Sequence, residues 1–180
     1  MTQTPMDRAL VEEATKKSAL IWVRGAGPAP AADRALWHVW HEGAVCLVGD
    51  GPGEQPLNGL GLVDGGAATV TVRSKDKGGR LVTWPARVAE LPPGGEAWTA
   101  AVEELKGKRL NAPDAERIAE RWARECRVLR LEPAPGPLEE LPSDSLAAPP
   151  HPSPALTRRP MPAGLPKLLT RRPRRARRGG

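Results

Sequence analysis

Cysteine, ring side chains and long apolar runs are all scarce in this chain of 180 residues. Tyr and Phe are absent, so six Trp supply every large ring that a core could use. Cys46 and Cys126 are too few and too far apart for a disulfide framework, which favours a reducing compartment. No stretch approaches the ~18 consecutive apolar residues of a membrane span, and the acid-containing N-terminus resembles neither a signal nor a transit peptide. We therefore expect a soluble, cytoplasmic protein with no membrane partner.

The net charge of +6 belongs to the C-terminal quarter of the chain. Residues 1–133 hold 18 Lys/Arg and 18 Asp/Glu, whereas residues 134–180 hold 9 and 3, together with 11 Pro. The second segment has no apolar periodicity, so it cannot bury enough surface to offset its ordering entropy. The sequence therefore predicts one α+β domain, mainly β, over residues 1–133 and a disordered Pro/Arg-rich tail over residues 134–180. Residues 158–178 are expected to bind polyanions weakly and non-specifically, because they lack aromatics for base stacking.

Hydrophobic periodicity and turn residues predict the order of elements in the domain. A hydroxyl cap and a proline, Thr4-Pro5, open an N-terminal helix. Glu42-Gly43 is the expected turn of a hairpin, and Trp40 and Trp122 are expected in the core. Pro85 indicates that its strand bends or lies at an edge. The remaining predicted elements are a strand over Ser18–Val23, hairpin arms over Ala35–His41 and Ala44–Val48, a long loop over 51–66, a second hairpin over Ala68–Arg73 and Leu81–Trp84, a helix over Glu96–Lys106, a helix begun by Asn111–Asp114, and a strand over Cys126–Glu132.

Three familiar kinds of site find little support in the residues. Gly49–Gly53 has misplaced glycines and no helix after it, so it indicates a turn and not a nucleotide loop. His38 and His41 would lie on opposite faces of a strand and have no third ligand nearby, so no metal site is expected. A serine nucleophile is also unsupported, because no Gly-x-Ser-x-Gly occurs.

The tip of the second hairpin is the most basic segment of the domain. Its four cations, one hydroxyl and two glycines could hold a phosphate through side chains and backbone N–H groups. A solvated loop kept soluble by its lysines is the plainer alternative. The residues that would hold the phosphate are Arg73, Ser74, Lys75, Lys77 and Arg80.

The predicted order of elements resembles the FMN-binding split barrel, the pyridoxamine 5′-phosphate oxidase-like family. The resemblance covers residues 6–133 and rests on the strand patterns of 18–23, 34–48 and 68–90 and on the ending Val128-Leu-Arg-Leu-Glu-Pro133. It implies a split β-barrel with flanking helices, a homodimer with the cofactor between subunits, and an FMN-dependent oxidoreductase of unknown substrate. A deazaflavin in place of FMN stays open. Hydride transfer would be the chemistry of the cofactor, and no catalytic acid or base can be named.

The chain departs from the family at its usual phosphate contacts. Arg34 stands where the family has an arginine opening the first hairpin, but Val39 replaces a common lysine. Glu54-Gln55 stands where the following loop has an Arg-Lys pair. Either the basic tip takes over the phosphate, or the barrel is a binding module that has lost its cofactor. A third hypothesis is a nucleic-acid-associated protein that acts through its tail.

Overall fold

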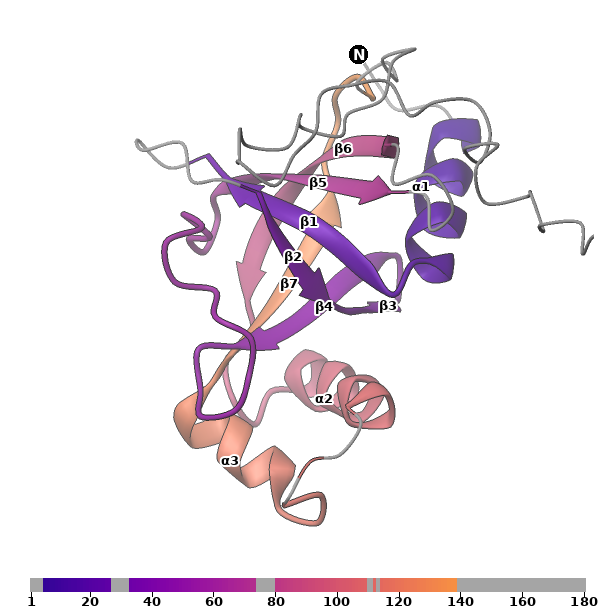
Figure 1. Cartoon of the computed structure of the whole chain (residues 1–180). Helices are drawn as coiled ribbons and strands as arrows, with labels where there is room; N and C mark the ends of the chain where they lie inside the picture. Colours follow the sequence, from indigo (N-terminus) through magenta and orange to yellow (C-terminus); the bar gives the residue numbers. More distant parts are fainter. Residues whose placement is uncertain (1–4, 27–32, 74–79, 110–111, 113, 139–180) are drawn as a thin grey trace, which may run out of the picture. The chain divides into compact units, whose positions relative to one another are not determined.

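Seven strands form a single antiparallel sheet that curls into a nearly closed barrel (Figure 1). The computed structural model describes residues 5–26, 33–73, 80–109, 112 and 114–138. The strand order is β2-β1-β5-β6-β7-β4-β3. The described elements are α1 (Pro5–Lys17), β1 (Leu20–Gly25), β2 (Arg34–Trp37), β3 (Val39–His41), β4 (Ala44–Gly49), β5 (Ala67–Arg73), β6 (Arg80–Glu90), α2 (Glu96–Lys108), α3 (Ile118–Glu125) and β7 (Arg127–Pro133). The α+β split barrel predicted from the sequence is confirmed, and the predicted tail lies outside the described residues from 139 onward.

The barrel nearly closes because its two edge strands are consecutive in the chain. β2 pairs with β1, β3 pairs with β4, and the single residue His38 lies between β2 and β3. The predicted turn at Glu42-Gly43 is confirmed, with φ of +46° and +76° at these two residues. The first arm of that hairpin is corrected, however. The arm breaks at His38 because its first half, β2, pairs with β1, and only its second half, β3, pairs with β4. The pairing of β2 with β1 could not be predicted from local sequence patterns.

Two apolar clusters lie on the two sides of the sheet. The interior cluster fills the barrel with inward-facing side chains such as Ile21, Val70 and Trp84, and α1 adds Val11 to it. The second cluster lies outside the barrel, between β4, β7 and the helices α2 and α3. β4 belongs to both clusters, so every one of its residues is buried. The barrel thus has one wall covered by helices, as Figure 1 shows.

Pro85 lies in the middle of β6, and β6 is an inner strand between β5 and β7. Of the two alternatives that Pro85 indicated, a bend or an edge position, the edge position is therefore wrong. The Pro85 carbonyl accepts a hydrogen bond from the Ala134 N–H at 2.9 Å, so the missing N–H of Pro85 faces the end of β7. Pairing between β6 and β7 starts at Ala86 opposite Pro133. The proline is tolerated because it sits just beyond that ladder.

The two tryptophans expected in the core differ in burial. Trp122 on α3 is fully buried in the outer cluster. Trp40 is only half-buried and meets Trp84 edge to face, with ring centroids 6.3 Å apart. Within the described residues, no helix is long and apolar enough to cross a bilayer.

Candidate functional site

The loop between β4 and β5, where the resemblance places phosphate contacts, is folded tightly onto the barrel. The Gln55 side chain forms hydrogen bonds with the backbone of Trp37, as a neighbouring strand would. Its Oε1 accepts from the Trp37 N–H at 2.9 Å, and its Nε2 donates to the carbonyls of Trp37 and Val48 at 2.9 and 3.1 Å. Asp50, at φ +65°, accepts from the N–H groups of Leu57 and Asn58. The loop therefore closes the seam between β2 and β4 with side-chain hydrogen bonds.

Glu54 turns inward from this loop, and its side chain is 0% exposed. Its Oε1 accepts from Arg121 Nη2 at 3.0 Å and from Trp122 Nε1 at 3.1 Å, and its Oε2 accepts from Arg109 Nε at 3.1 Å. The two arginines also donate to loop carbonyls, those of Pro52 and Gly53. Glu54 therefore fastens the loop to α3 and to the C-terminal end of α2.

The charges around Glu54 balance. Arg121 also donates to the Asp114 carboxylate, at 2.7 Å from its Nε and 3.3 Å from its Nη2. Hydrogen bonds from Arg121 lower the pKa of Asp114, and those of Asp114 and Glu54 raise the pKa of Arg121. Two cations and two carboxylates thus form one network. A phosphate approaching this loop meets carbonyls and satisfied ion pairs, in place of the cations that the resemblance implies.

Arg34, the first of the predicted cofactor-binding residues, is occupied by the same loop. Its Nη1 donates to the carbonyls of Pro56 and Asn58, both at 2.9 Å. These bonds hold the loop against the start of β2. The predicted role of Arg34 in cofactor binding stays a prediction.

Arg73, at the end of β5, lies in a different environment. Its guanidinium carbon is 4.5 Å from the centre of the Trp22 ring, a cation–π distance. Its Nε is buried and has no hydrogen-bond partner within the part of the chain that the structure describes. Ser74, Lys75 and Lys77 lie outside the described residues. Arg80 begins β6, and only its backbone is described.

The structure does not bring Arg34 and Arg73 together. Arg34 lies opposite Val23, near the C-terminal end of β1. Arg73 is two residues beyond Thr71, which lies opposite Trp22, so Arg73 is near the N-terminal end of β1. Three residues of β1 separate the two levels, about 10 Å along a strand. Arg34 is bonded to the carbonyls of Pro56 and Asn58, whereas Arg73 is stacked on Trp22, so the two side chains do not converge on one point.

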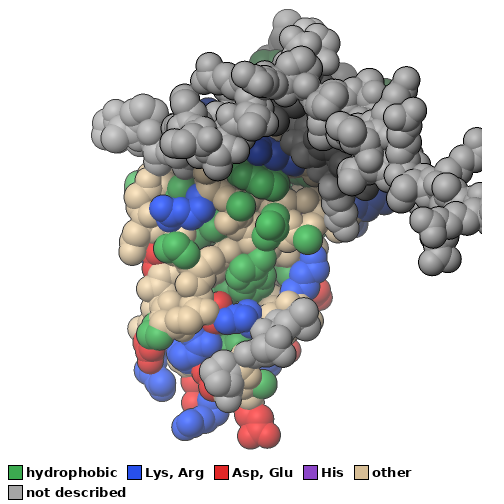
Figure 2. All heavy atoms as spheres, viewed as in Figure 1, with side chains coloured by type: hydrophobic (Ala, Val, Ile, Leu, Met, Phe, Trp, Pro, Cys, Tyr) green, Lys and Arg blue, Asp and Glu red, His purple; other side chains and the backbone are tan. Residues whose placement is uncertain are grey.

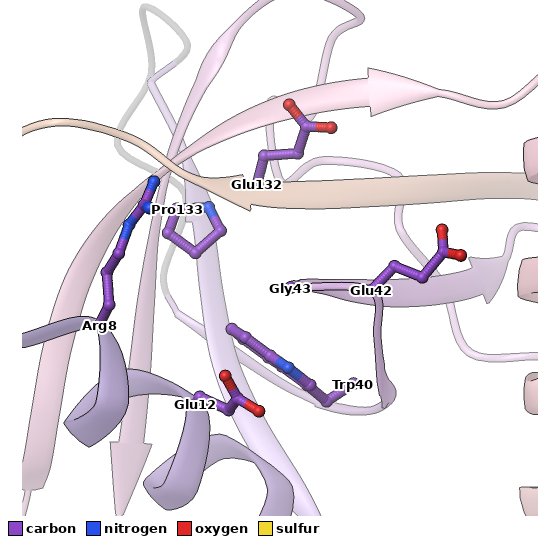
Figure 3. Close-up of a pocket in the computed structure, with 7 residues that line it drawn as sticks. All are labelled: Arg8, Glu12, Trp40, Glu42, Gly43, Glu132 and Pro133. Carbon is purple, nitrogen blue, oxygen red and sulfur yellow. The ribbon is translucent and has the colours of Figure 1, made fainter. Parts of the chain in front are cut away.

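A hollow of about 400 Å³ lies between α1, the β3–β4 turn and the end of β7 (Figure 3). Trp40 forms part of its wall, and Arg8 is the cation among its lining residues. Its three carboxylates have basic neighbours: Glu12 pairs with Lys16, Glu132 pairs with Arg130, and Glu42 lies 3.7 Å from His41. This hollow has more acid than base in its lining, so it does not suit a phosphate.

His38 and the two cysteines have ordinary structural roles. His38 is buried, its Nε2 lies 3.0 Å from the Thr15 carbonyl, and burial lowers its pKa to about 4. Burial raises the thiol pKa of Cys46 and of Cys126 to about 11, so neither is a reactive thiolate at neutral pH. Among the described residues, no group of three or more His, Cys, Asp and Glu could hold a metal ion.

Sequence reasoning missed Arg109, Arg121 and Asp114. These residues lie more than fifty positions from Glu54 in the chain, and single charges on helices look like solvated surface residues. The available signal was an acid at a position where the family has a base. An acid at such a position indicates that it is paired with basic side chains from another segment of the chain.

Comparison with known proteins supports the fold and leaves the activity open. No family model matches the chain, and no curated protein matches it. The heme storage protein HutZ from Vibrio cholerae superposes with a TM-score of 0.52 at 13% identity, over 77% of this chain and 94% of HutZ.

Two further solved structures superpose less well. A putative pyridoxamine 5′-phosphate oxidase from Corynebacterium glutamicum has a TM-score of 0.44 at 9% identity, over 74% of this chain and 91% of its own. An FAD- and heme-binding protein from Mycobacterium smegmatis has a TM-score of 0.43 at 15% identity, over 91% and 93%. Identities this low concern the fold alone, and HutZ supports the split barrel predicted from the sequence, which is confirmed.

Proposed function

We propose that this chain is an FMN-dependent oxidoreductase in which the second hairpin, not the loop after β4, holds the cofactor phosphate. The observation that carries this proposal is Arg73, a guanidinium stacked on Trp22 with a buried Nε that has no hydrogen-bond partner among the described residues. Buried donors are rarely left unpaired, so this N–H suits an anionic ligand. In sequence, Arg73 opens the tip Ser74, Lys75, Lys77 and Arg80, which would add further contacts. FMN would supply hydride chemistry, and these residues would bind and orient it.

A homodimer is part of the same proposal. The outer face of β1 and β2 is apolar beside Arg73: Leu20 is 43% exposed, Ala35 is exposed and Trp22 is half-buried. Figure 2 shows apolar side chains gathered on this side of the molecule, with charged ones of both signs near the helices. A second copy covering this face would bury the apolar surface next to Arg73. Cys46 and Cys126 are both free, which supports a cytoplasmic location.

Absorption spectroscopy and FMN titration of the purified full chain test the proposal. We expect a flavin spectrum and saturable binding that Arg73→Ala weakens at least tenfold, because one charge-assisted contact contributes about 1.5–3 kcal/mol. Arg24→Ala is the matched control, since Arg24 lies on the same outer face near the other end of β1 and pairs with Asp33. Equal FMN affinity in the parent and in Arg73→Ala would contradict the proposed phosphate site.

The second candidate is a split-barrel binding module that has lost the cofactor. The burial of Glu54 favours it, because the loop that normally supplies cations is fully committed to internal contacts. A parent protein that is colourless and binds neither FMN nor a deazaflavin would support this candidate. Saturable binding of the deazaflavin alone would keep the redox function and replace the cofactor.

A further inference from the structure

Trp22 and Arg73 meet diagonally on the outer face of the barrel, where β1 and β5 are neighbouring strands (Figure 1). Trp22 lies directly opposite Thr71, and Arg73 is two residues beyond Thr71, so the three side chains share one face. Aromatic and long side chains reach each other across such a diagonal. We propose that Trp22 is a positioning residue, which holds the Arg73 guanidinium so that its N–H edge is presented to the cofactor phosphate. This inference rests on the proposed function, because it concerns the same site.

The place of Trp22 is set by its neighbours in the sheet. One row of paired residues crosses four adjacent strands, from Ala35 on β2 through Trp22 on β1 and Thr71 on β5 to Thr83 on β6. Thr71 and Thr83 are buried, and their hydroxyl oxygens are 3.0 Å apart, so one hydroxyl donates to the other. Trp22 itself is half-buried. The ring therefore lies beside a buried, hydrogen-bonded pair and can support a more flexible side chain.

Stacking on Trp22 determines which part of Arg73 a ligand can meet. The guanidinium carbon lies over the ring, 4.5 Å from its centre, so the ring covers one face of the guanidinium. Arginine binds phosphate through its edges, where the N–H groups lie in one plane. The Nε–H belongs to such an edge, and it is buried without a hydrogen-bond partner among the residues that the structure describes. The stack therefore covers a face that phosphate does not use and keeps an edge that it does.

The stack also lowers the entropic cost of binding. An arginine side chain has several rotatable bonds, and a ligand that orders it must offset the lost rotamer freedom. Arg24, on the same face of β1, offers a contrast, because its Nε lies 3.7 Å from the Asp33 carboxylate and its charge has a partner. Arg73 is ordered by an uncharged ring instead, so its positive charge stays available to an anion.

FMN titration of the full chain, followed by flavin fluorescence, tests this role. Trp22→Leu should weaken FMN binding about fivefold or more, the effect of losing a partly desolvated cation–π contact. Trp22→Phe keeps an aromatic face and should restore most of the affinity. In the Arg73→Ala background, Trp22→Leu should have no further effect, because Trp22 acts through Arg73. Trp40→Leu, which replaces another half-buried tryptophan, is the matched control and should not change FMN affinity.

Riboflavin, which lacks the phosphate, separates positioning of Arg73 from direct contact with the flavin. Trp22→Leu should leave the affinity for riboflavin unchanged. An equal loss of affinity for FMN and for riboflavin would overturn the positioning role, because Trp22 would then contact the flavin itself. A loss of FMN affinity that persists in the Arg73→Ala background would overturn it for the same reason.

A measurement without any ligand separates this inference from the proposed function. By NMR we expect slow hydrogen exchange of the Arg73 Nε–H in the parent and in Trp22→Phe, and faster exchange in Trp22→Leu. A parent protein that shows this pattern but binds no FMN would contradict the proposed function and still support the positioning of Arg73 by Trp22. Equal exchange of the Arg73 Nε–H in the parent and in Trp22→Leu would overturn the inference, even if FMN binds.

Discussion

At the residue scale, two side chains of the same type differ in burial and therefore in their expected contribution to stability. Trp122 is fully buried and donates to Glu54, whereas Trp40 is half-buried and lines a hollow. Both follow the apolar periodicity of their elements, so periodicity alone predicts the same role for both. Their contributions to the free energy of unfolding should differ, because only Trp122 is completely enclosed by other residues.

Trp122→Ala should lower the free energy of unfolding by about 3–5 kcal/mol, the usual cost of emptying a buried aromatic site. Trp122→Phe should lower it less, because it keeps most of the ring volume and loses only the N–H to Glu54. Trp40→Ala should also cost less than Trp122→Ala. Urea unfolding of the three variants measures these differences, and an equal loss in the two alanine variants would contradict this assignment.

His38 should make stability depend on pH in the acid range. Its folded pKa of about 4 lies below the ordinary value of 6.5, so the unfolded chain binds the proton more readily. Stability is therefore lost as pH falls from about 6.5 to 4, by about 3 kcal/mol for this shift. Urea unfolding at pH 7 and pH 4.5 measures the loss. His38→Gln should lose much less stability over the same interval, and an equal loss would show that other groups titrate there.

At the scale of elements, the loop after β4 behaves as an extra strand. Gln55 bonds to both backbone groups of Trp37, Asp50 closes the root of the loop, and Arg34 holds its far side. Each contact joins residues distant in sequence. The loop thus rigidifies the seam where the barrel would otherwise stay open.

Gln55→Glu tests this role at nearly constant volume. It removes the two Nε2 donors, to the carbonyls of Trp37 and Val48, and we expect a loss of about 1–3 kcal/mol. Hydrogen exchange at the Trp37 amide should also become faster. Asn58→Asp, at an exposed position of the same loop, is the control and should change neither quantity. Unchanged stability in Gln55→Glu would mean that the seam is held by other contacts.

At the scale of the whole molecule, the charges are unevenly distributed along the sequence, and the net charge of +6 lies after residue 133. Residues 1–133 carry 18 positive and 18 negative side chains. The described contacts continue a little beyond Pro133, since Ala134 donates to Pro85 and Leu138 packs against the interior cluster. Residues 134–180 therefore carry net charge that residues 1–133 lack.

Truncation after Leu138 should leave the melting temperature nearly unchanged, whereas truncation after Pro133 should lower it by removing the Ala134 and Leu138 contacts. Both truncations should abolish any binding to DNA, because the electrostatic attraction of non-specific binding then has no net charge to act through. Thermal unfolding and a salt-dependent DNA titration measure the two effects. Tight DNA binding by residues 1–138 would place the interaction on the barrel.

Local physics determined most of the elements in advance. Alternating strands and the Glu42-Gly43 turn depend on neighbouring residues, so they could be predicted from the sequence. The predicted cap Thr4 lies outside the described residues, and the helix expected to begin at Asn111–Asp114 begins at Ile118 instead. The resemblance, which rested on their order, predicted the barrel. The candidate site was harder, because only its residue types and not their partners could be predicted.

The tertiary structure alone decided which residues meet. It separated Arg34 from Arg73, broke the first hairpin at His38 and turned Glu54 toward Arg109 and Arg121. None of these follows from local patterns, because each joins segments brought together only when the sheet curls and the helices pack on it. The role of a charged residue depends on its burial and its partners, which the sequence does not give. In sequence, Glu54 is an acid at a position where a phosphate-binding base was expected; in the folded chain it is the centre of an ion-pair network.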